Sequence, residues 1–98
     1  MNKRVIFRLS MPGRPPTSTW GQGKNYFVTR MLSVAEIERL KLPNYFVHHF
    51  GDGWAAGIHA EVVEPRTRLP KSDGFQAYDW MVDNLLRYGQ TDKPKGAV

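Results

Sequence analysis

The feature that most constrains the fold is an order of signals that occurs twice along the chain: two strand-like stretches and then a helix. At the start, Val5, Phe7 and Leu9 alternate with more polar neighbours, which is the period-two pattern of a strand with one buried face. Residues 25–32 are rich in aromatic and branched side chains and predict a second strand. Ser33 and Glu36 then have the spacing of a capping box, which predicts a short helix to about residue 41.

The second half of the chain shows the same order. Residues 44–50 and 54–64 predict two strands joined by the loop Gly51-Asp52-Gly53. Ser72 or Asp73 is expected to cap a last helix that stops at Gly89. The apolar stripe of this helix consists of Phe75, Tyr78, Val82 and Leu85.

These signals predict an α+β fold of ββαββα order. We expect a four-stranded, mainly antiparallel sheet with both helices packed on one face, which leaves the other face to bind a ligand or a second copy of the chain. The order of the strands in the sheet stays open, because this succession can be wound in more than one way. We expect residues 1–89 to form one compact domain and residues 90–98 to form a flexible tail.

Composition excludes several classes of protein. The chain has 98 residues and no cysteine, which removes disulfides and thiol catalysis and fits a reducing, cytoplasmic environment. No apolar run reaches the length of a membrane span. The sequence shows no nucleophile elbow and no paired carboxylates of recognisable spacing, so we expect neither an enzyme nor a bound cofactor.

Charge is distributed unevenly along the chain. The net charge is +5, and the first 35 residues contain six basic residues and no acidic one. A field of this sign attracts anionic partners, although a solvated basic face is the plainer alternative. We predict a site for a phosphate-bearing ligand, a nucleotide or a nucleic acid, in this part of the chain. Its residues are expected to be Arg4, Arg8, Arg14, Trp20, Lys24, Tyr26 and Arg30.

The glycine-rich turn of residues 20–25 belongs to this predicted site. Consecutive backbone N–H groups around Gly21 and Gly23 can cradle a phosphate beside Lys24. The turn lacks the remaining residues of a P-loop, because Asn25 follows the lysine. A hairpin connector with Trp20 folded onto the core is the alternative reading.

Pairing across the second hairpin predicts a binding platform. If Phe50 pairs with Trp54, then Tyr45 lies opposite His59 on a mixed face that also carries His49. Such a surface suits base stacking or contact with a protein, and a register slip of one residue would exchange the two faces. The other face, which includes His48, is expected to be core.

Two further predictions concern a metal site and the last helix. His48 and His49 are neighbours on a strand, so their side chains point to opposite faces and cannot bind one metal ion; we expect no metal site. On the last helix, Asp79 and Asp83 form an acidic pair that is expected either to pair with the basic first third of the chain or to face a partner. Trp80 is expected to be half exposed and to act as an interface anchor.

The aromatic-rich stretches of residues 20–26 and 73–80 give the chain a general character. In these stretches and in its short, cysteine-free make-up, it resembles the small accessory proteins of bacteriophages and mobile elements. The resemblance implies a viral protein that binds and sequesters a host protein or a nucleotide. The alternative to phosphate binding is therefore a protein-interaction module, an inhibitor or adaptor, that acts through the exposed sheet face and the last helix and forms a homodimer.

Overall fold

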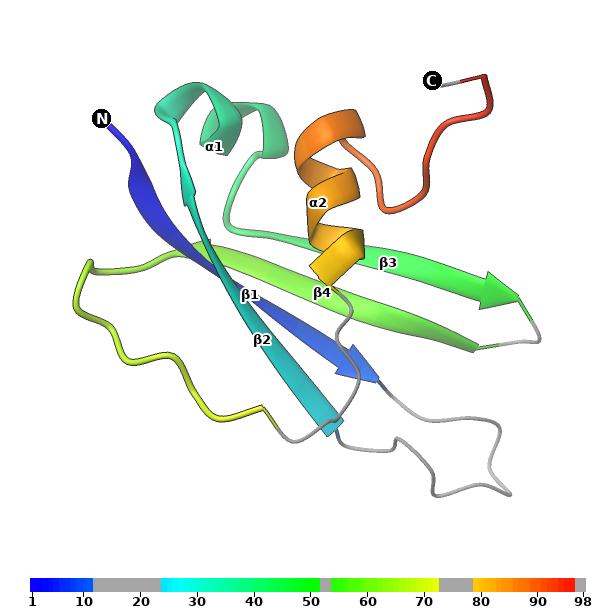
Figure 1. The fold of residues 1–98 in the computed structure, drawn as a ribbon, viewed down its shortest axis with the longest axis horizontal. Coiled ribbons are helices and arrows are strands. Elements are labelled where there is room, and N and C mark those ends of the chain that lie inside the picture. Colours follow the sequence, from blue (N-terminus) through cyan, green and yellow to red (C-terminus); the bar gives the residue numbers. More distant parts are fainter. Residues whose placement is uncertain (12–23, 52–53, 73–78, 97–98) are drawn as a thin grey trace.

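The described residues form six secondary-structure elements, which follow one another in the predicted order. The computed structural model describes residues 1–11, 24–51, 54–72 and 79–96. The elements are β1 (Lys3–Met11), β2 (Lys24–Leu32), α1 (Val34–Leu40), β3 (Asn44–Gly51), β4 (Trp54–Val62) and α2 (Asp79–Tyr88), drawn in Figure 1. The α+β class and the ββαββα order are thus confirmed.

The strands form one antiparallel sheet in the order β2-β1-β4-β3. The central pair, β1 and β4, comes from the two halves of the chain, so the two β-hairpins lie side by side and form a continuous sheet. Val5 pairs with Val62 and Leu9 with Ile58 across this junction. The long-range β1–β4 pairing settles the strand order that the sequence left open.

One face of the sheet, the core face, packs against both helices. The predicted inward residues of β1 are fully buried, as are the facing residues of β4. Leu40 from α1 and Met81, Val82 and Leu85 from α2 join the same cluster. The strand residues of this cluster are Val5, Phe7, Leu9, Val28, Leu32, Ala56, Ile58 and Ala60.

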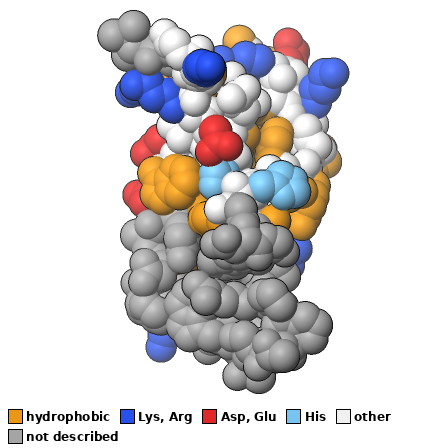
Figure 2. Space-filling view, turned by 90° about the vertical axis from the view of Figure 1, so that its right-hand side faces the viewer, with side chains coloured by type: hydrophobic (Ala, Val, Ile, Leu, Met, Phe, Trp, Pro, Cys, Tyr) orange, Lys and Arg blue, Asp and Glu red, His pale blue; other side chains and the backbone are white. Residues whose placement is uncertain are grey.

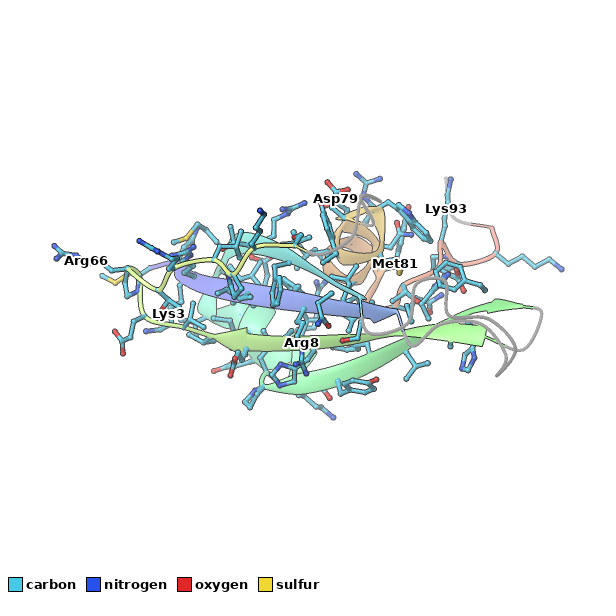
Figure 3. The ribbon with its side chains drawn as sticks, turned by 90° about the horizontal axis from the view of Figure 1, so that it is seen from below. Lys3, Arg8, Arg66, Asp79, Met81 and Lys93 are labelled. Carbon is cyan, nitrogen blue, oxygen red and sulfur yellow. The ribbon has the colours of Figure 1, made fainter. Side chains whose placement is uncertain are left out.

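The opposite face, which we call the open face, carries the alternate residues of each strand. Arg8 extends from the sheet on the side away from Met81 and Asp79 of α2 (Figure 3). None of the described helices and strands lies over this face. Its residues are Arg4, Ile6, Arg8 and Ser10 of β1, Asn25, Phe27, Thr29 and Met31 of β2, Tyr45, Val47 and His49 of β3, and Ala55, Gly57, His59 and Glu61 of β4.

The predicted register of the second hairpin is confirmed over most of its length and wrong beside the turn. Tyr45 lies opposite His59, and His49 lies opposite Ala55. Near the loop, Trp54 pairs with Gly51 and not with Phe50, because the ladder shifts by one residue between His49 and Gly51. Such an irregularity changes the alignment locally and leaves the assignment of faces further along unaltered.

Helix α1 begins at the capping box that the sequence predicts. The Ser33 hydroxyl accepts from the Glu36 N–H at 3.2 Å, and the Glu36 carboxylate accepts from the Ser33 N–H at 3.0 Å. The backbone N–H and then the hydroxyl of Ser33 lower the pKa of the Glu36 carboxyl, and Arg39 lowers it further. At the other end, Lys41 has a φ of +56°, and its N–H donates to the carbonyl of Glu38.

Helix α2 ends where the sequence predicts. Val82 and Leu85 of the expected stripe are fully buried, and Gly89 has a φ of +77° with its N–H on the Leu85 carbonyl. Asp73, one of the two expected caps, and the stripe residues Phe75 and Tyr78 lie outside the described residues.

The segment that follows α2 begins in contact with the domain. Thr91 is buried, and its hydroxyl lies 2.8 Å from Nδ1 of His48, which is also buried. Asn84 donates to the Thr91 carbonyl, and Asp92 lies 3.5 Å from the same imidazole nitrogen. The expectation that His48 belongs to the core is confirmed, and the packed domain reaches at least as far as Thr91.

Replacement of Ser33 by alanine tests the cap. Ser33→Ala should lower the free energy of unfolding by about 1 kcal/mol at neutral pH, because an N–H of the first turn loses its acceptor. A lowered pKa means that the Glu36 carboxylate stabilises the fold above its ordinary pKa and ceases to do so as pH falls through the lowered value. Ser33→Ala also removes the hydroxyl that donates to the Glu36 carboxylate at 3.1 Å, and this part of the deficit depends on the charge of Glu36. The deficit should therefore become smaller in acid, without vanishing, as measured by urea denaturation. Glu38→Gln, which removes a charge elsewhere on α1, is the control, and an equal loss there would contradict the assignment.

Replacement of Thr91 by valine tests the contact of the C-terminal segment. Thr91→Val keeps the side-chain shape but leaves the buried His48 Nδ1 without its hydroxyl partner, so the free energy of unfolding should fall by about 1–3 kcal/mol. Asp92→Asn should cost less, because the Asp92 side chain is 69% exposed. Chemical denaturation of both variants makes the measurement. Equal stability of Thr91→Val and the parent chain would show that this contact contributes nothing.

Candidate functional site

One row of side chains crosses all four strands on the open face. Arg8 of β1 pairs with Phe27 of β2 on one side and with His59 of β4 on the other. His59 in turn pairs with Tyr45 of β3. Because residues opposite one another in a sheet project to the same face, these four side chains form the continuous row Phe27–Arg8–His59–Tyr45.

The row is accessible at its Tyr45 end and partly covered at its Phe27 end. Tyr45 is 58% exposed and Arg8 is exposed, whereas Phe27 and His59 are half-buried. The Tyr45 ring lies across Gly57: a Cβ built on Gly57 would be 1.9 Å from the Tyr45 hydroxyl oxygen. Gly57 therefore provides the space in which the tyrosine ring lies against the sheet.

A hollow of about 380 Å³ adjoins the Phe27 end of the row. Its volume is within the range of about 300–1,000 Å³ that is common for small-ligand sites. Ile6, a residue of the open face, is only 8% exposed there. The hollow is lined by Ile6, Arg8, Phe27, His59, Glu61, Val63, Thr67, Arg68 and Pro70.

The outer wall of the hollow is residues 63–72, which we call the connector. It leaves the end of β4 and returns along the sheet to the start of β2 (Figure 1). Arg4 holds its first part, donating from the guanidinium to the carbonyls of Pro65, at 3.1 Å, and of Thr67. Ser72 holds its last part, since its hydroxyl accepts from the Phe27 N–H at 3.0 Å on the free edge of β2. The wall is thus fixed to the sheet at both ends.

Three charged side chains line the hollow: Arg8, Arg68 and Glu61. No hydrogen bond or ion pair within the described part of the chain engages any of the three. All three are exposed. Two guanidinium groups and one carboxylate are therefore available at this place to a ligand that offers both acceptors and donors.

The residues predicted to bind phosphate do not gather at one site. Arg4 and Arg8 lie on the open face, and Arg4 is engaged by the connector. Tyr26 and Arg30 belong to the opposite face, where Tyr26 packs against the core. Lys24 is the first residue of β2, and Arg14, Trp20 and the glycines of the turn, Gly21 and Gly23, lie outside the described residues.

Arg30 is neutralised by helix α2. Its guanidinium lies 3.1 Å from the Asp83 carboxylate and 3.9 Å from that of Asp79. The expectation that this acidic pair meets the basic first third of the chain is confirmed. On the core side of the sheet, the positive charge of Arg30 is therefore opposed by two carboxylates.

The three predicted platform residues lie together, and the predicted interface anchor, Trp80, lies on the last helix. Tyr45, His49 and His59 share the open face. Trp80 is 42% exposed, as expected, but it belongs to α2 and packs edge-on against His48, with ring centroids 5.2 Å apart. Figure 2 shows the side of the molecule that is on the right in Figure 1, where histidine side chains lie beside hydrophobic and acidic ones. Trp80 is therefore separate from the platform.

Phe27, Ile6 and Arg68 were not expected at the site. Their positions depend on the β1–β2 register and on the path of the connector, neither of which has a local sequence signal. The alternation in β1 did place Arg8 and Ile6 on the same face. With the Arg8–Phe27 pairing known, Phe27 would have followed.

Substitution of Gly57 tests whether the tyrosine position depends on it. Gly57→Ala should displace the Tyr45 ring from the sheet, because the new methyl group would occupy the place of its hydroxyl end. Stability should change by less than about 1 kcal/mol, since the ring is exposed and alanine suits a strand better than glycine. NMR shifts of the Tyr45 ring, with urea denaturation, make the measurement. Unchanged Tyr45 shifts would disprove the contact.

Neither a metal centre nor a membrane helix is found in the described ranges. Within residues 1–11, 24–51, 54–72 and 79–96, no three His, Asp or Glu side chains are grouped so that they could hold a metal ion. Neither α1 nor α2 is long and apolar enough to cross a membrane.

Comparison with known proteins gives no relative from which a role could be transferred. No family model, curated protein or solved structure matches this chain. The function must therefore be argued from the row, the hollow and their charges.

Proposed function

We propose that this chain is a non-enzymatic binding protein that holds single-stranded nucleic acid across its open face. The observation that carries the proposal is the row Phe27–Arg8–His59–Tyr45, which places three flat rings and one guanidinium across the whole width of the sheet. Every nucleobase has a π-face that can stack on an aromatic side chain, so such a row binds bases without regard to sequence.

The dimensions of the row suit a short stretch of nucleotides. Neighbouring strands lie about 4.8 Å apart, so a row across four strands spans about 14 Å. A four-stranded sheet that presents aromatic side chains can stack two or three bases. Tyr45 and Phe27, at the two ends of the row, are the side chains that we assign to stacking.

Arg8 lies between the rings of Phe27 and His59, and we assign its guanidinium to a phosphate of the ligand. A guanidinium binds phosphate oxygens through a planar pair of N–H donors and also stacks on bases. Arg8 is exposed and has no ion-pair partner among the described residues. Arg4 and Arg68 add positive charge, and Glu61 is an acidic side chain that lines the same hollow as Arg8 and Arg68.

The opposite side of the molecule is less suited to an anionic polymer. There Asp79 and Asp83 surround Arg30, and Trp80 lies next to His48. Phosphates approaching this side would meet two carboxylates, which oppose them. The open face is therefore the side that we assign to the ligand.

Anisotropy titrations with labelled oligonucleotides test the proposal. Oligothymidine and oligouridine of about 12 nucleotides should bind, and the affinity should fall with salt at a log–log slope of about −0.7 for each phosphate neutralised. Tyr45→Ala should weaken binding by about 1–3 kcal/mol through lost stacking. Arg8→Gln should weaken it and reduce the magnitude of the salt slope by about 0.7, because one phosphate contact is lost.

Arg87→Gln is the matched control for Arg8→Gln. It makes the same change of charge on α2, on the other side of the sheet, and should leave both affinity and slope close to those of the parent chain. Folding of each variant is checked by circular dichroism. Absence of oligonucleotide binding would refute the proposal and favour a protein partner for the open face. Equal effects of the two arginine variants would remove the assignment to this face.

A further inference from the structure

We infer that the hollow beside Phe27 is a specificity pocket for a guanine base. The inference rests on the proposed function, which assigns the neighbouring row to bases of any kind. It starts from the lining of the hollow, which combines an apolar floor and walls with two guanidinium groups and one carboxylate. That combination is unusual for a surface that only binds phosphate, because a carboxylate repels phosphate.

The carboxylate of Glu61 identifies the base. An ionised carboxylate only accepts hydrogen bonds, and its two oxygens can accept from two adjacent donors. Among the four standard bases, guanine presents two adjacent N–H donors, N1–H and the N2 amino group, on its Watson–Crick edge. Adenine, cytosine and uracil each present one donor group there. A carboxylate with no partner among the described residues therefore favours guanine.

The arginines of the hollow complement the remaining edge of the same base. Guanine carries acceptors at O6 and N7, and arginine is the side chain that most often binds this pair. Arg8 and Arg68 reach the hollow from the sheet and from the connector, so guanidinium groups border it on two sides. Guanine can direct its two N–H donors toward Glu61 and its two acceptors toward an arginine at the same time.

The apolar lining matches the faces of a base. Ile6 forms the floor, Phe27 presents a ring from β2, and Pro70 contributes from the connector. A flat heterocycle can lie among such groups with its edges directed to the charged side chains. The volume of about 380 Å³ is enough for one small ligand of this class.

The wall of the pocket is fixed before any ligand binds. Arg4 and Ser72 attach the connector to β1 and β2 through the hydrogen bonds described above. Pre-formed walls reduce the conformational cost of binding, which favours discrimination between ligands of similar shape. Of the connector residues that line the hollow, Thr67 is itself held by Arg4, and Arg68 and Pro70 lie between the two attachments.

The test compares oligothymidines that differ at one central position. That position carries guanine, inosine, adenine or thymine, and affinity is measured by anisotropy at one salt concentration. The parent chain should bind the guanine oligonucleotide about tenfold more tightly than the others. Inosine is the sharpest comparison, because it differs from guanine by the N2 amino group alone and should lose most of that preference.

Two glutamate variants make the assignment specific. Glu61→Gln should bind guanine and inosine oligonucleotides equally. The amide replaces one of the two accepting oxygens by an NH2 donor, so the side chain can no longer accept from two adjacent donors. Glu64→Gln makes the same change three residues away, outside the lining of the hollow, and should keep the guanine preference. Loss of the preference in both variants, or in neither, would overturn the role of Glu61.

The remaining outcomes separate this inference from the proposed function. Equal binding of all four oligonucleotides by the parent chain overturns the guanine pocket and leaves the stacking row in place. If no oligonucleotide binds, the stacking row is overturned, and a titration with guanosine monophosphate then tests the pocket alone. Binding of guanosine monophosphate that Glu61→Gln abolishes would support a pocket for a free guanine nucleotide. Absence of this binding would refute the pocket as well.

Discussion

Antiparallel pairing of β1 with β4 is the contact that places every other element of this structure. β1 has β2 on its other side, and β4 has β3, so the two hairpins become one sheet only through this junction. The paired residues alternate between the two faces. Phe7 and Ala60 belong to the core, and Arg8 and His59 belong to the open face. The same register thus determines which side chains pack under the helices and which form the row.

Small residues on β4 let the helices approach the sheet closely. Ala56 and Ala60 are fully buried members of the core cluster, while Phe7 and Ile58 supply its bulk. Alternating large and small side chains allow the layers to interdigitate at the density typical of protein interiors. Gly57 plays a comparable part on the open face, where its missing side chain leaves room for the Tyr45 ring. One strand therefore shapes both surfaces of the sheet.

Local patterns in the sequence were sufficient to predict the elements and much of the second hairpin. The alternation in β1, the Ser33–Glu36 cap and the stop at Gly89 each depend on residues close together in the chain, and so does the Tyr45–His59 pairing across a short loop. The site was less predictable because its parts meet through long-range pairing. Arg8 meets His59 across 51 positions, and only the winding of the sheet brings them together.

The basic first third of the chain shows why charge counted along a sequence does not define a surface. Alternation along a strand sends neighbouring residues to opposite faces, and β1 and β2 divide their arginines in this way. Arg30 turns to the core face and meets Asp79 and Asp83, and Arg4 is used to attach the connector. Arg8 stays on the open face without a described partner, between Phe27 and His59. Of the three arginines of β1 and β2, the one available to a ligand is therefore the one that lies between aromatic rings, because the fold itself occupies the other two.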